Sequence, residues 1–364
     1  MRTLCFVFFI MLTSGYVCAQ KDNKWYRFID TKTNLTGYKD ATGKIKVSAK
    51  FGPLTRASVF RNIIAIDEEV SERNFANYYL LKTGKKVGVD STYIWDFTFP
   101  FENEEKIIFR DKKTDRVGFF DKNGIIAIPA VYNDAMPFHN GLALVIRNAK
   151  RICWEGGEAT KSNPCEHWSW KGVTSIINAK NDILVDSLDL DSIPLINWYS
   201  LKIGDNPLDN SLYINLKGVN GRVYSFVDYK REFQQWFSSK FLTIKNAKQL
   251  RQCCFKVFSA QINRRKYNDR QMLSSDFAMV SNYLNKIKNN RLQSDTESDD
   301  LYSDVYGKKG FEMFYNDIGE HDRFKYPAFV VYVGNKKNLN EESFRFLRTD
   351  YGYKLISMVL KKRN

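Results

Sequence analysis

Short apolar runs alternate with polar, glycine-containing turns along the first part of the chain. The clearest example is GFFDKNGIIAI, which runs from Gly118 to Ile128. Its Asn123-Gly124 pair supplies the positive φ that a tight hairpin turn requires, and Asp121 offers an acceptor for the turn amides. Ile126 and Ile128 share one face of the returning strand, as the two-residue period of a strand demands. The pattern therefore predicts a β-hairpin.

The hairpin pattern recurs along the chain. GYKDATGKIKV has the same layout, and its turn glycine, Gly43, lies 81 residues before Gly124. Half that interval predicts a middle copy, and Gly84 ends the stretch YYLLKTG at that place. A Phe-x-Asn mark follows each turn, at Phe60-Arg61-Asn62, Phe101-Glu102-Asn103 and Phe138-His139-Asn140. Units this small cannot bury their own apolar faces, so we expect them to stack and share one continuous core.

A fourth, degraded copy is IINAKND, which begins at Ile176 and has Asn181 in place of the turn glycine. Asn181 follows Gly124 by 57 residues, which is 17 more than the interval between Gly84 and Gly124. The extra length coincides with the segment from Arg151 to Trp170, which carries two cysteines. We therefore interpret this segment as an insertion in the array.

The third unit resembles the units of the WG-repeat family of bacterial proteins. The matching positions are Gly118, Asp121, Gly124, Pro129, Tyr132, Pro137, Phe138, Gly141, Leu142 and Ala143. The first unit is a fair match, the second and fourth are weak, and the family's tryptophan is replaced by Val117 and Thr36. The resemblance covers roughly residues 25–190. It implies an all-β repeat scaffold with a structural or binding role, and it supplies no catalytic residue.

We therefore expect a solenoid- or propeller-like array of β-hairpins over residues 25–203, followed by a second domain over residues 204–364. In that domain Asn220-Gly221 predicts another hairpin. Helices are expected along Tyr229, Phe233, Trp236, Phe237 and Phe241, after the cap Asn246 along Leu250, Cys254, Val257 and Phe258, and along Phe277, Val280, Leu284 and Ile287. The acidic stretch LQSDTESDDLYSD is expected to be loose. The closing runs AFVVYV, SFRFLR and YKLISMVL predict strands, which together give an α+β domain with an antiparallel sheet.

The N-terminus predicts export. Arg2 precedes an apolar run from Thr3 to Leu12, and Val17-Cys18-Ala19 offers small residues for cleavage, so residues 1–19 are interpreted as a secretory signal peptide. The apolar run is shorter than the ~20 residues that span a bilayer. A lipoprotein signal acylated at Cys18 is the alternative. We expect a periplasmic or cell-surface protein with no transmembrane segment after signal removal.

The charge changes the expected partners. Lysine and arginine number 56 against 41 acidic residues, a formal net charge of +15. A basic exported protein suits an anionic envelope glycan, although the basic residues are spread along the chain, as on an ordinary solvated surface. Nucleic acid is not expected, because no recognition motif is present. No catalytic, cofactor-binding or metal-ligating residue is predicted, although the carboxylate pairs of glycoside hydrolases leave no short signature.

The insertion carries the most distinctive side chains. Cys153 and Cys165 flank a polar, glycine-containing loop, and an exported protein favours a disulfide between them. A metal site that adds His167 is the alternative, but it lacks a fourth ligand. Three tryptophans cluster around the loop: Trp154, Trp168 and Trp170. They suit either a platform on which a ligand stacks or an aromatic cap on the repeat core.

Two further groups complete the candidates. Cys254 lies on the apolar face of its predicted helix and is expected to be buried, whereas the pairing of Cys253 stays open. Glu320, His321 and Asp322 are adjacent in a polar segment, which we interpret as a solvated turn. The sequence thus favours a non-catalytic exported scaffold that binds a protein or an envelope glycan. The alternative is a glycan-processing hydrolase with its site in the cleft between the domains.

Overall fold

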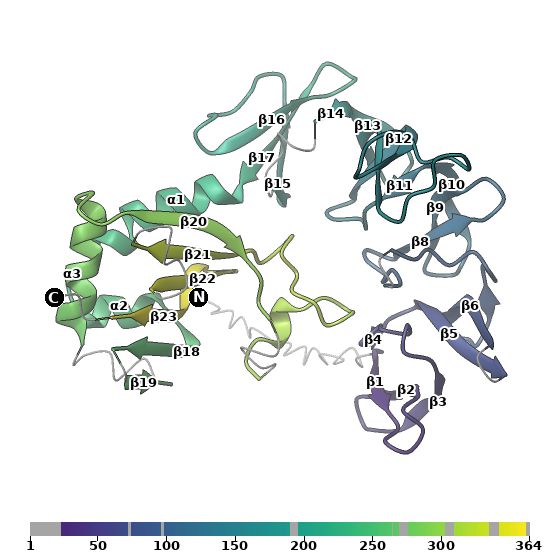
Figure 1. Cartoon of the computed structure of the whole chain (residues 1–364), viewed down its shortest axis with the longest axis horizontal. Helices are drawn as coiled ribbons and strands as arrows, with labels where there is room; N and C mark the ends of the chain where they lie inside the picture. Colours follow the sequence, from purple (N-terminus) through teal and green to yellow (C-terminus); the bar gives the residue numbers. More distant parts are fainter. Residues whose placement is uncertain are drawn as a thin grey trace, which may run out of the picture.

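Sheets follow one another along an arc in this protein, from the purple N-terminal end to the teal middle of the chain, and the helices gather beyond them (Figure 1). The computed structural model describes residues 23–71, 74–95, 98–189, 196–263, 265–268, 276–302, 309–334 and 342–361. The predicted signal peptide, residues 1–19, lies outside the described residues. Mainly β-structure with several antiparallel sheets is confirmed.

Within the described residues, the chain from Trp25 to Asp228 forms four antiparallel sheets. The first has the order β4-β1-β2-β3-β5-β6-β7, and the others have the orders β10-β9-β8, β11-β12-β13-β14 and β15-β17-β16. The first sheet contains β1 (Trp25–Ile29), β2 (Thr36–Asp40), β3 (Ile45–Phe51), β4 (Val59–Phe60), β5 (Ile63–Ser71), β6 (Asn74–Leu81) and β7 (Lys86–Val87). The other three contain β8 (Lys106–Asp111), β9 (Arg116–Asp121), β10 (Ile126–Tyr132), β11 (Asp134–Ala135), β12 (Leu142–Cys153), β13 (Trp168–Asn178), β14 (Ile183–Leu188), β15 (Ile196–Gly204), β16 (Tyr213–Lys217) and β17 (Val223–Asp228).

The repeat turn has one hydrogen-bond pattern at Gly43, Gly84 and Gly124. At the third turn, the N–H of Gly124 donates to the carbonyl of Asp121 over 2.9 Å, and the N–H of Asp121 donates to the carbonyl of Ile125 over 2.8 Å. The first two turns repeat both bonds. The φ angles of the three glycines are 86°, 85° and 71°. The three turns therefore share one local shape.

The same turn occurs twice more. The N–H of Asn181 donates to the carbonyl of Asn178, and that of Gly221 donates to the carbonyl of Gly218, each over 3.0 Å. Their φ angles are 72° and 79°. Gly221 follows Asn181 by 40 residues, the interval that separates Gly84 from Gly124. The hairpin at Gly221, which the sequence placed in the second domain, thus has the geometry of the repeat.

Two glycines of the third unit are required by close packing. A Cβ on Gly118 would lie 2.4 Å from the carbonyl oxygen of Ile128, because β10 crosses directly over this position. A Cβ on Gly124 would lie 2.8 Å from a methyl group of Val87 in the preceding unit, and its positive φ disfavours other residues as well. The first contact joins strands within a unit, and the second joins neighbouring units.

The repeats bury a series of small apolar clusters. Phe109 and Phe120 stack at 4.2 Å between the second and third units. Phe119 belongs to a separate cluster that extends to Ile177 in the fourth unit. A further cluster joins the fourth unit to β15 and β17, where Trp198 and Phe226 meet edge to face at 5.7 Å. The single continuous core expected from the sequence is wrong, because the buried apolar residues divide into separate clusters, each shared by two or three successive units.

The C-terminal sheet has six strands in the order β19-β18-β23-β22-β21-β20. Its strands are β18 (Cys254–Ile262), β19 (Arg265–Tyr267), β20 (Ser294–Asp299), β21 (Ala328–Val333), β22 (Ser343–Thr349) and β23 (Gly352–Leu360). The pairing of β18 with β23 is parallel, and the other named pairings are antiparallel. The prediction of a wholly antiparallel sheet is therefore wrong for β18 and β23. The chain between these two strands is long enough to make the crossover connection that a parallel pair requires.

Three helices accompany this sheet: α1 (Tyr229–Ser239), α2 (Ala247–Cys253) and α3 (Phe277–Lys288), with short 3-10 helices at η2 (Phe241–Thr243) and η4 (Glu312–Phe314). The Asp228 carboxylate caps α1, and Phe233 on its buried face stacks on Phe329 of the sheet at 4.7 Å. Asn246 caps α2 as predicted. Within the described residues, every helix is too short or too polar to cross a bilayer.

Two predictions in this domain are wrong. The helix expected to continue to Phe258 ends at Cys253, and β18 begins at Cys254, whose thiol is buried as predicted. Pairing with β23 decides this outcome, because a short apolar run is compatible with either a helix or a strand. The acidic stretch expected to be loose contains β20, an edge strand that pairs with β21 along its whole length. Its charges are tolerated because the strand borders solvent.

Candidate functional site

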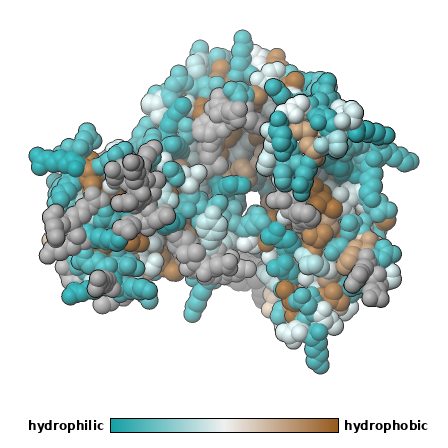
Figure 2. All heavy atoms as spheres, viewed as in Figure 1, coloured by the Kyte–Doolittle hydropathy of each residue, from teal (hydrophilic) through white to brown (hydrophobic). Residues whose placement is uncertain are grey.

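A cavity of about 1300 Å³ lies between the repeats and the C-terminal domain. The face drawn in Figure 2 is hollowed near its middle. Residues from the Phe-x-Asn marks of the first three units line one side of the cavity, namely Arg61, Asn62, Phe101, Glu102, Asn103 and His139. Residues 300–302 and residues 313–326, which lie between β20 and β21, line the other side. We call residues 309–326 the closing segment, because they extend from the C-terminal sheet back to the first unit.

Asparagines of the marks join neighbouring units along the cavity. The side-chain amide of Asn103 donates to the carbonyl of Phe138 over 2.6 Å. The amide of Asn140 donates to the carbonyl of Trp198 over 2.8 Å. The first bond runs from the second mark to the phenylalanine of the third, and the second bond runs from the third mark to β15. The marks thus form a polar ladder that fixes the spacing of the units.

Two glutamates fill the remaining positions of this ladder. The Glu102 carboxylate accepts from the backbone and side-chain amides of Asn62, over 2.9 and 2.6 Å, and from the N–H of Ile63. The Glu104 carboxylate accepts from the N–H groups of Asn140 and Gly141, over 2.5 and 2.6 Å. Both carboxylates are therefore engaged in joining units. Sequence reasoning missed them because the donors lie about forty residues away.

The closing segment reaches the first unit through polar contacts alone. The guanidinium of Arg61 pairs with both carboxylate oxygens of Asp317. The N–H groups of Ser58 and Val59 donate to the carbonyl of Asp317, over 2.6 and 3.1 Å. Arg56 pairs with Glu320 over 3.2 Å. We call this contact the clasp. Among the described residues, no apolar cluster joins the closing segment to residues 25–110.

A buried histidine marks the place where the closing segment meets the third unit. The ring of Phe324 lies 4.5 Å from that of His139. Only 4% of His139 is exposed, and its Nε2 atom has no hydrogen-bond partner among the described residues. Burial lowers the pKa of His139 to about 4. The imidazole is thus neutral at physiological pH, and protonation opposes this contact.

The turn predicted at residues 319–322 is solvated only in part, because Glu320 is exposed whereas His321 and Asp322 are partly buried in the wall of the cavity. Nε2 of His321 donates to the carbonyl of Tyr326 over 2.6 Å, and Nδ1 faces the N–H of Leu301 at 3.3 Å. Burial raises the pKa of Asp322. Glu320 points instead to Arg56, so the three side chains do not converge. Among the described residues, no three His, Cys, Asp or Glu side chains are grouped to hold a metal ion.

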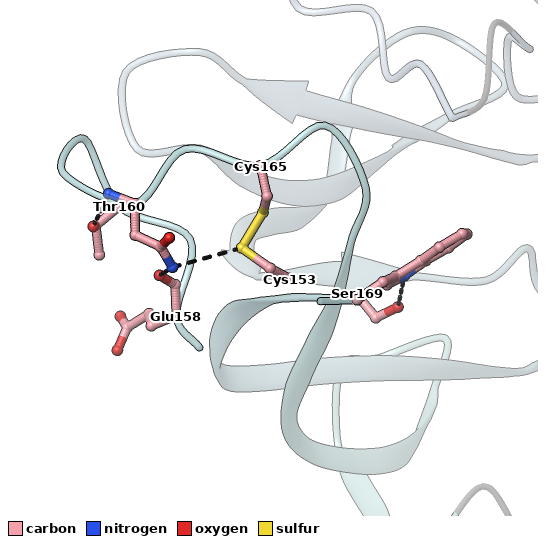
Figure 3. Close-up of a disulfide and its surroundings, with 7 residues drawn as sticks. Cys153, Glu158, Thr160, Cys165 and Ser169 are labelled. Atoms are coloured by element: carbon pink, nitrogen blue, oxygen red, sulfur yellow. Dashed lines mark hydrogen bonds between the residues drawn. A yellow bond between two sulfur atoms is a disulfide. The ribbon is translucent and has the colours of Figure 1, made fainter. Parts of the chain in front are cut away.

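The tryptophan-bearing insertion lies on the extended β12–β13 hairpin. Cys153 and Cys165 are disulfide-bonded with their Cα atoms 5.9 Å apart (Figure 3). The guanidinium carbon of Arg151 lies 4.4 Å from the ring centre of Trp168 and 4.9 Å from that of Trp170. Trp154 is 70% exposed. None of these three tryptophans lines the cavity or belongs to an apolar cluster of the described residues.

Comparison with known protein families supports the repeat assignment. Residues 118–150 match the WG containing repeat. This segment is similar to a WG repeat. It contains the Gly124 turn, the Gly118 close approach and the third Phe-x-Asn mark, so the matched segment contributes Pro137 and His139 to the cavity wall. No curated protein matches the chain.

Proposed function

We propose that this protein is a non-catalytic exported scaffold whose WG repeat and neighbouring units bind a polar ligand in the central cavity. The observation that carries the proposal is the composition of the cavity wall. Three successive marks form one side, and a segment held by a polar clasp forms the other. Repeat arrays offer extended concave surfaces for binding. Export is supported by the disulfide, since disulfides persist in oxidising compartments.

The cavity favours an uncharged glycan over an anionic one. Its lining carries seven carboxylates against five lysine and arginine side chains, so it is not basic although the whole chain is. A polyanion would meet like charge there. Tyr302 and Met313 line the cavity and are 58% and 55% exposed. Such apolar side chains among polar groups suit the faces and hydroxyls of a sugar chain. An anionic envelope glycan would then bind elsewhere on the basic surface.

We further propose that the array has five units and ends near Asp228, later than the boundary at residue 203 suggested by the sequence. The turn at Gly221 and the cluster around Trp198 and Phe226 support this division. A curved row of stacked units fits these observations. The C-terminal domain would then start at Tyr229, whose helix is capped by Asp228 itself.

Binding to an oligosaccharide panel tests the proposal. Tyr302→Ala should weaken glycan binding about tenfold. Val219→Ala is the matched control, because Val219 is 62% exposed and lies outside the cavity lining. Equal affinities of the two variants would contradict a cavity site. Isothermal titration calorimetry measures both without a label.

The clasp should control access to the cavity. Arg61→Asp places two carboxylates together and should open the arc, because no apolar cluster holds this contact. Combining it with Asp317→Arg restores opposite charges and should close the arc again. The radius of gyration from small-angle X-ray scattering measures both states. A double variant that stays as open as Arg61→Asp would exclude the clasp as the cause.

A hydrolase at the same cavity is the second candidate. The observation that favours it is Asp322, a partly buried carboxyl group in the cavity wall whose pKa is raised by desolvation, as a general acid requires. Against it, Glu102, Glu104, Asp317 and Glu320 are all engaged in hydrogen bonds or ion pairs. Release of reducing ends from a glycan, lost in Asp322→Asn, would establish the hydrolase and overturn the binding proposal.

A further inference from the structure

The insertion between β12 and β13 interrupts the period of the array without adding to its core. It delays the fourth turn by 17 residues. None of residues 154–172 belongs to an apolar cluster of the described residues. The three tryptophans of the insertion therefore lie outside the described apolar clusters. Because the insertion adds nothing to the apolar core of the array, we look to it for a role in recognition, which surface loops often have.

The insertion is nevertheless well ordered. The Cys153–Cys165 disulfide closes it, and Asn163 donates from its side chain to the carbonyl of Glu158 over 3.0 Å (Figure 3). The N–H of Ala159 donates to the carbonyl of Arg151 over 2.8 Å. Order in the absence of a core requires such covalent and polar restraints. The loop is thus held in one shape before any ligand arrives.

Two of the three tryptophans already have a partner. The guanidinium of Arg151 lies against the rings of both Trp168 and Trp170, which meet edge to face with centroids 5.1 Å apart, and Arg151 pairs with Asp115 of the third unit over 2.6 Å. This stack attaches the insertion to the array. It leaves Trp154 as the tryptophan of the insertion with an open face.

Trp154 is exposed but fixed in orientation. Its Nε1 donates to Ser169 Oγ over 2.9 Å, the bond that Figure 3 draws beside Ser169. The ring of His167 stacks on it, with centroids 5.1 Å apart and planes 26° apart. A neighbour stacked on one face leaves the other face to solvent, in agreement with the 70% exposure. An exposed aromatic ring that cannot reorient is preorganised for stacking.

We propose that Trp154, supported by His167, binds a pyranose ring of a glycan. A protein interface requires several apolar side chains around its central anchor. Within the insertion from Arg151 to Trp170, however, Trp154 is the only strongly exposed large apolar side chain among the described residues. The neighbouring side chains of the loop are polar, including Glu155, Lys161 and Glu166. One flat ring with a polar rim matches the apolar face and equatorial hydroxyls of a sugar.

The test uses the full exported chain with chitotetraose, cellotetraose and maltotetraose as probes. Binding of at least one probe should shift tryptophan fluorescence, and Trp154→Ala should weaken that binding about tenfold. Trp154→Phe should retain part of the affinity. Trp95→Ala is the matched control, because Trp95 is 52% exposed and lies outside the insertion. Its affinity should equal that of the wild type.

Three results would overturn the proposal: no binding of any probe, an unchanged affinity of Trp154→Ala, or an equal loss in Trp95→Ala. The proposal does not rest on the cavity. A probe that loses affinity with Tyr302→Ala but not with Trp154→Ala binds in the cavity and contradicts the Trp154 site alone. Circular dichroism of the Trp154 variants checks that the fold is kept, and the surface position of Trp154 favours this result.

Discussion

The burial of His139 makes the stability of this protein depend on pH in a defined direction. The pKa of His139 is about 4 in the folded chain, against about 6.5 for an unperturbed histidine. As pH falls below the higher value, the unfolded chain takes up a proton and the folded chain does not. The free energy of unfolding therefore decreases from pH 6.5 down to pH 4 and shows no contribution from this group above that window.

The size of the effect follows from the difference between the two pKa values. Each unit corresponds to about 1.4 kcal/mol, so the complete loss is about 3 kcal/mol below pH 4. At pH 5 it amounts to about 2 kcal/mol, because the unfolded chain is then almost fully protonated at this site. Among the described residues, His139 Nε2 has no hydrogen-bond partner that would reduce the free-energy cost of protonating the buried ring.

Urea unfolding at several pH values measures the effect, with His139→Phe as the reference. Phenylalanine keeps the aromatic contact with Phe324 and does not titrate. The difference in unfolding free energy between wild type and variant isolates His139 from the carboxylates, which titrate equally in both proteins. It should change by about 2 kcal/mol between pH 7.5 and pH 5. A difference that stays constant across this range would refute the reasoning.

Three further predictions concern stability. Gly118→Ala should destabilise the third unit by about 1–3 kcal/mol, because the added methyl group meets the carbonyl of Ile128; thermal unfolding measures this, and an unchanged melting temperature would contradict the close approach. Replacing both Cys153 and Cys165 by serine should cost at most about 3 kcal/mol and expose the insertion to proteolysis without loosening the repeats; hydrogen exchange that rises throughout the array would disagree. Phe233→Ala should cost about 3–5 kcal/mol in the C-terminal domain, seen in urea unfolding, and a cost below 1 kcal/mol would mean that the site collapses around the cavity.

Much of the repeat could be predicted from the chain alone, because its turn is a local structure. The positive φ at Gly43, Gly84 and Gly124 and the acceptor at Asp121 depend on residues within four positions of one another. Local hydrogen bonds of this kind recur wherever the same residues recur. The sequence predicts the hairpin at Gly221 but not its place in the array, because Gly218 replaces the aspartate of the motif, although the backbone forms the same bonds.

The C-terminal domain shows where local patterns fail. The helix α3 was predicted with its buried face, since Val280, Leu284 and Ile287 follow the helical period. The run that begins at Cys254 was assigned to a helix but pairs with β23, about a hundred residues further along the chain. Long-range pairing overrides local propensity in such short apolar runs. The edge strand β20 was missed for the same reason, because its sequence is acidic and its partner is distant.

The sequence by itself determined the repeat turn, its interval and the presence of an insertion with two cysteines, because each follows from residues close together in the chain. Only the tertiary structure shows where the cavity lies, which residues form the clasp, and that one face of the Trp154 ring is exposed. Asp317 pairs with Arg61 although the two residues are more than 250 positions apart in the sequence. The guanidinium of Arg151 covers the rings of Trp168 and Trp170, and no sequence pattern shows that these two rings are covered while that of Trp154 is exposed. Contacts of this kind depend on how the arc of units curves, which is set by the packing of many side chains together.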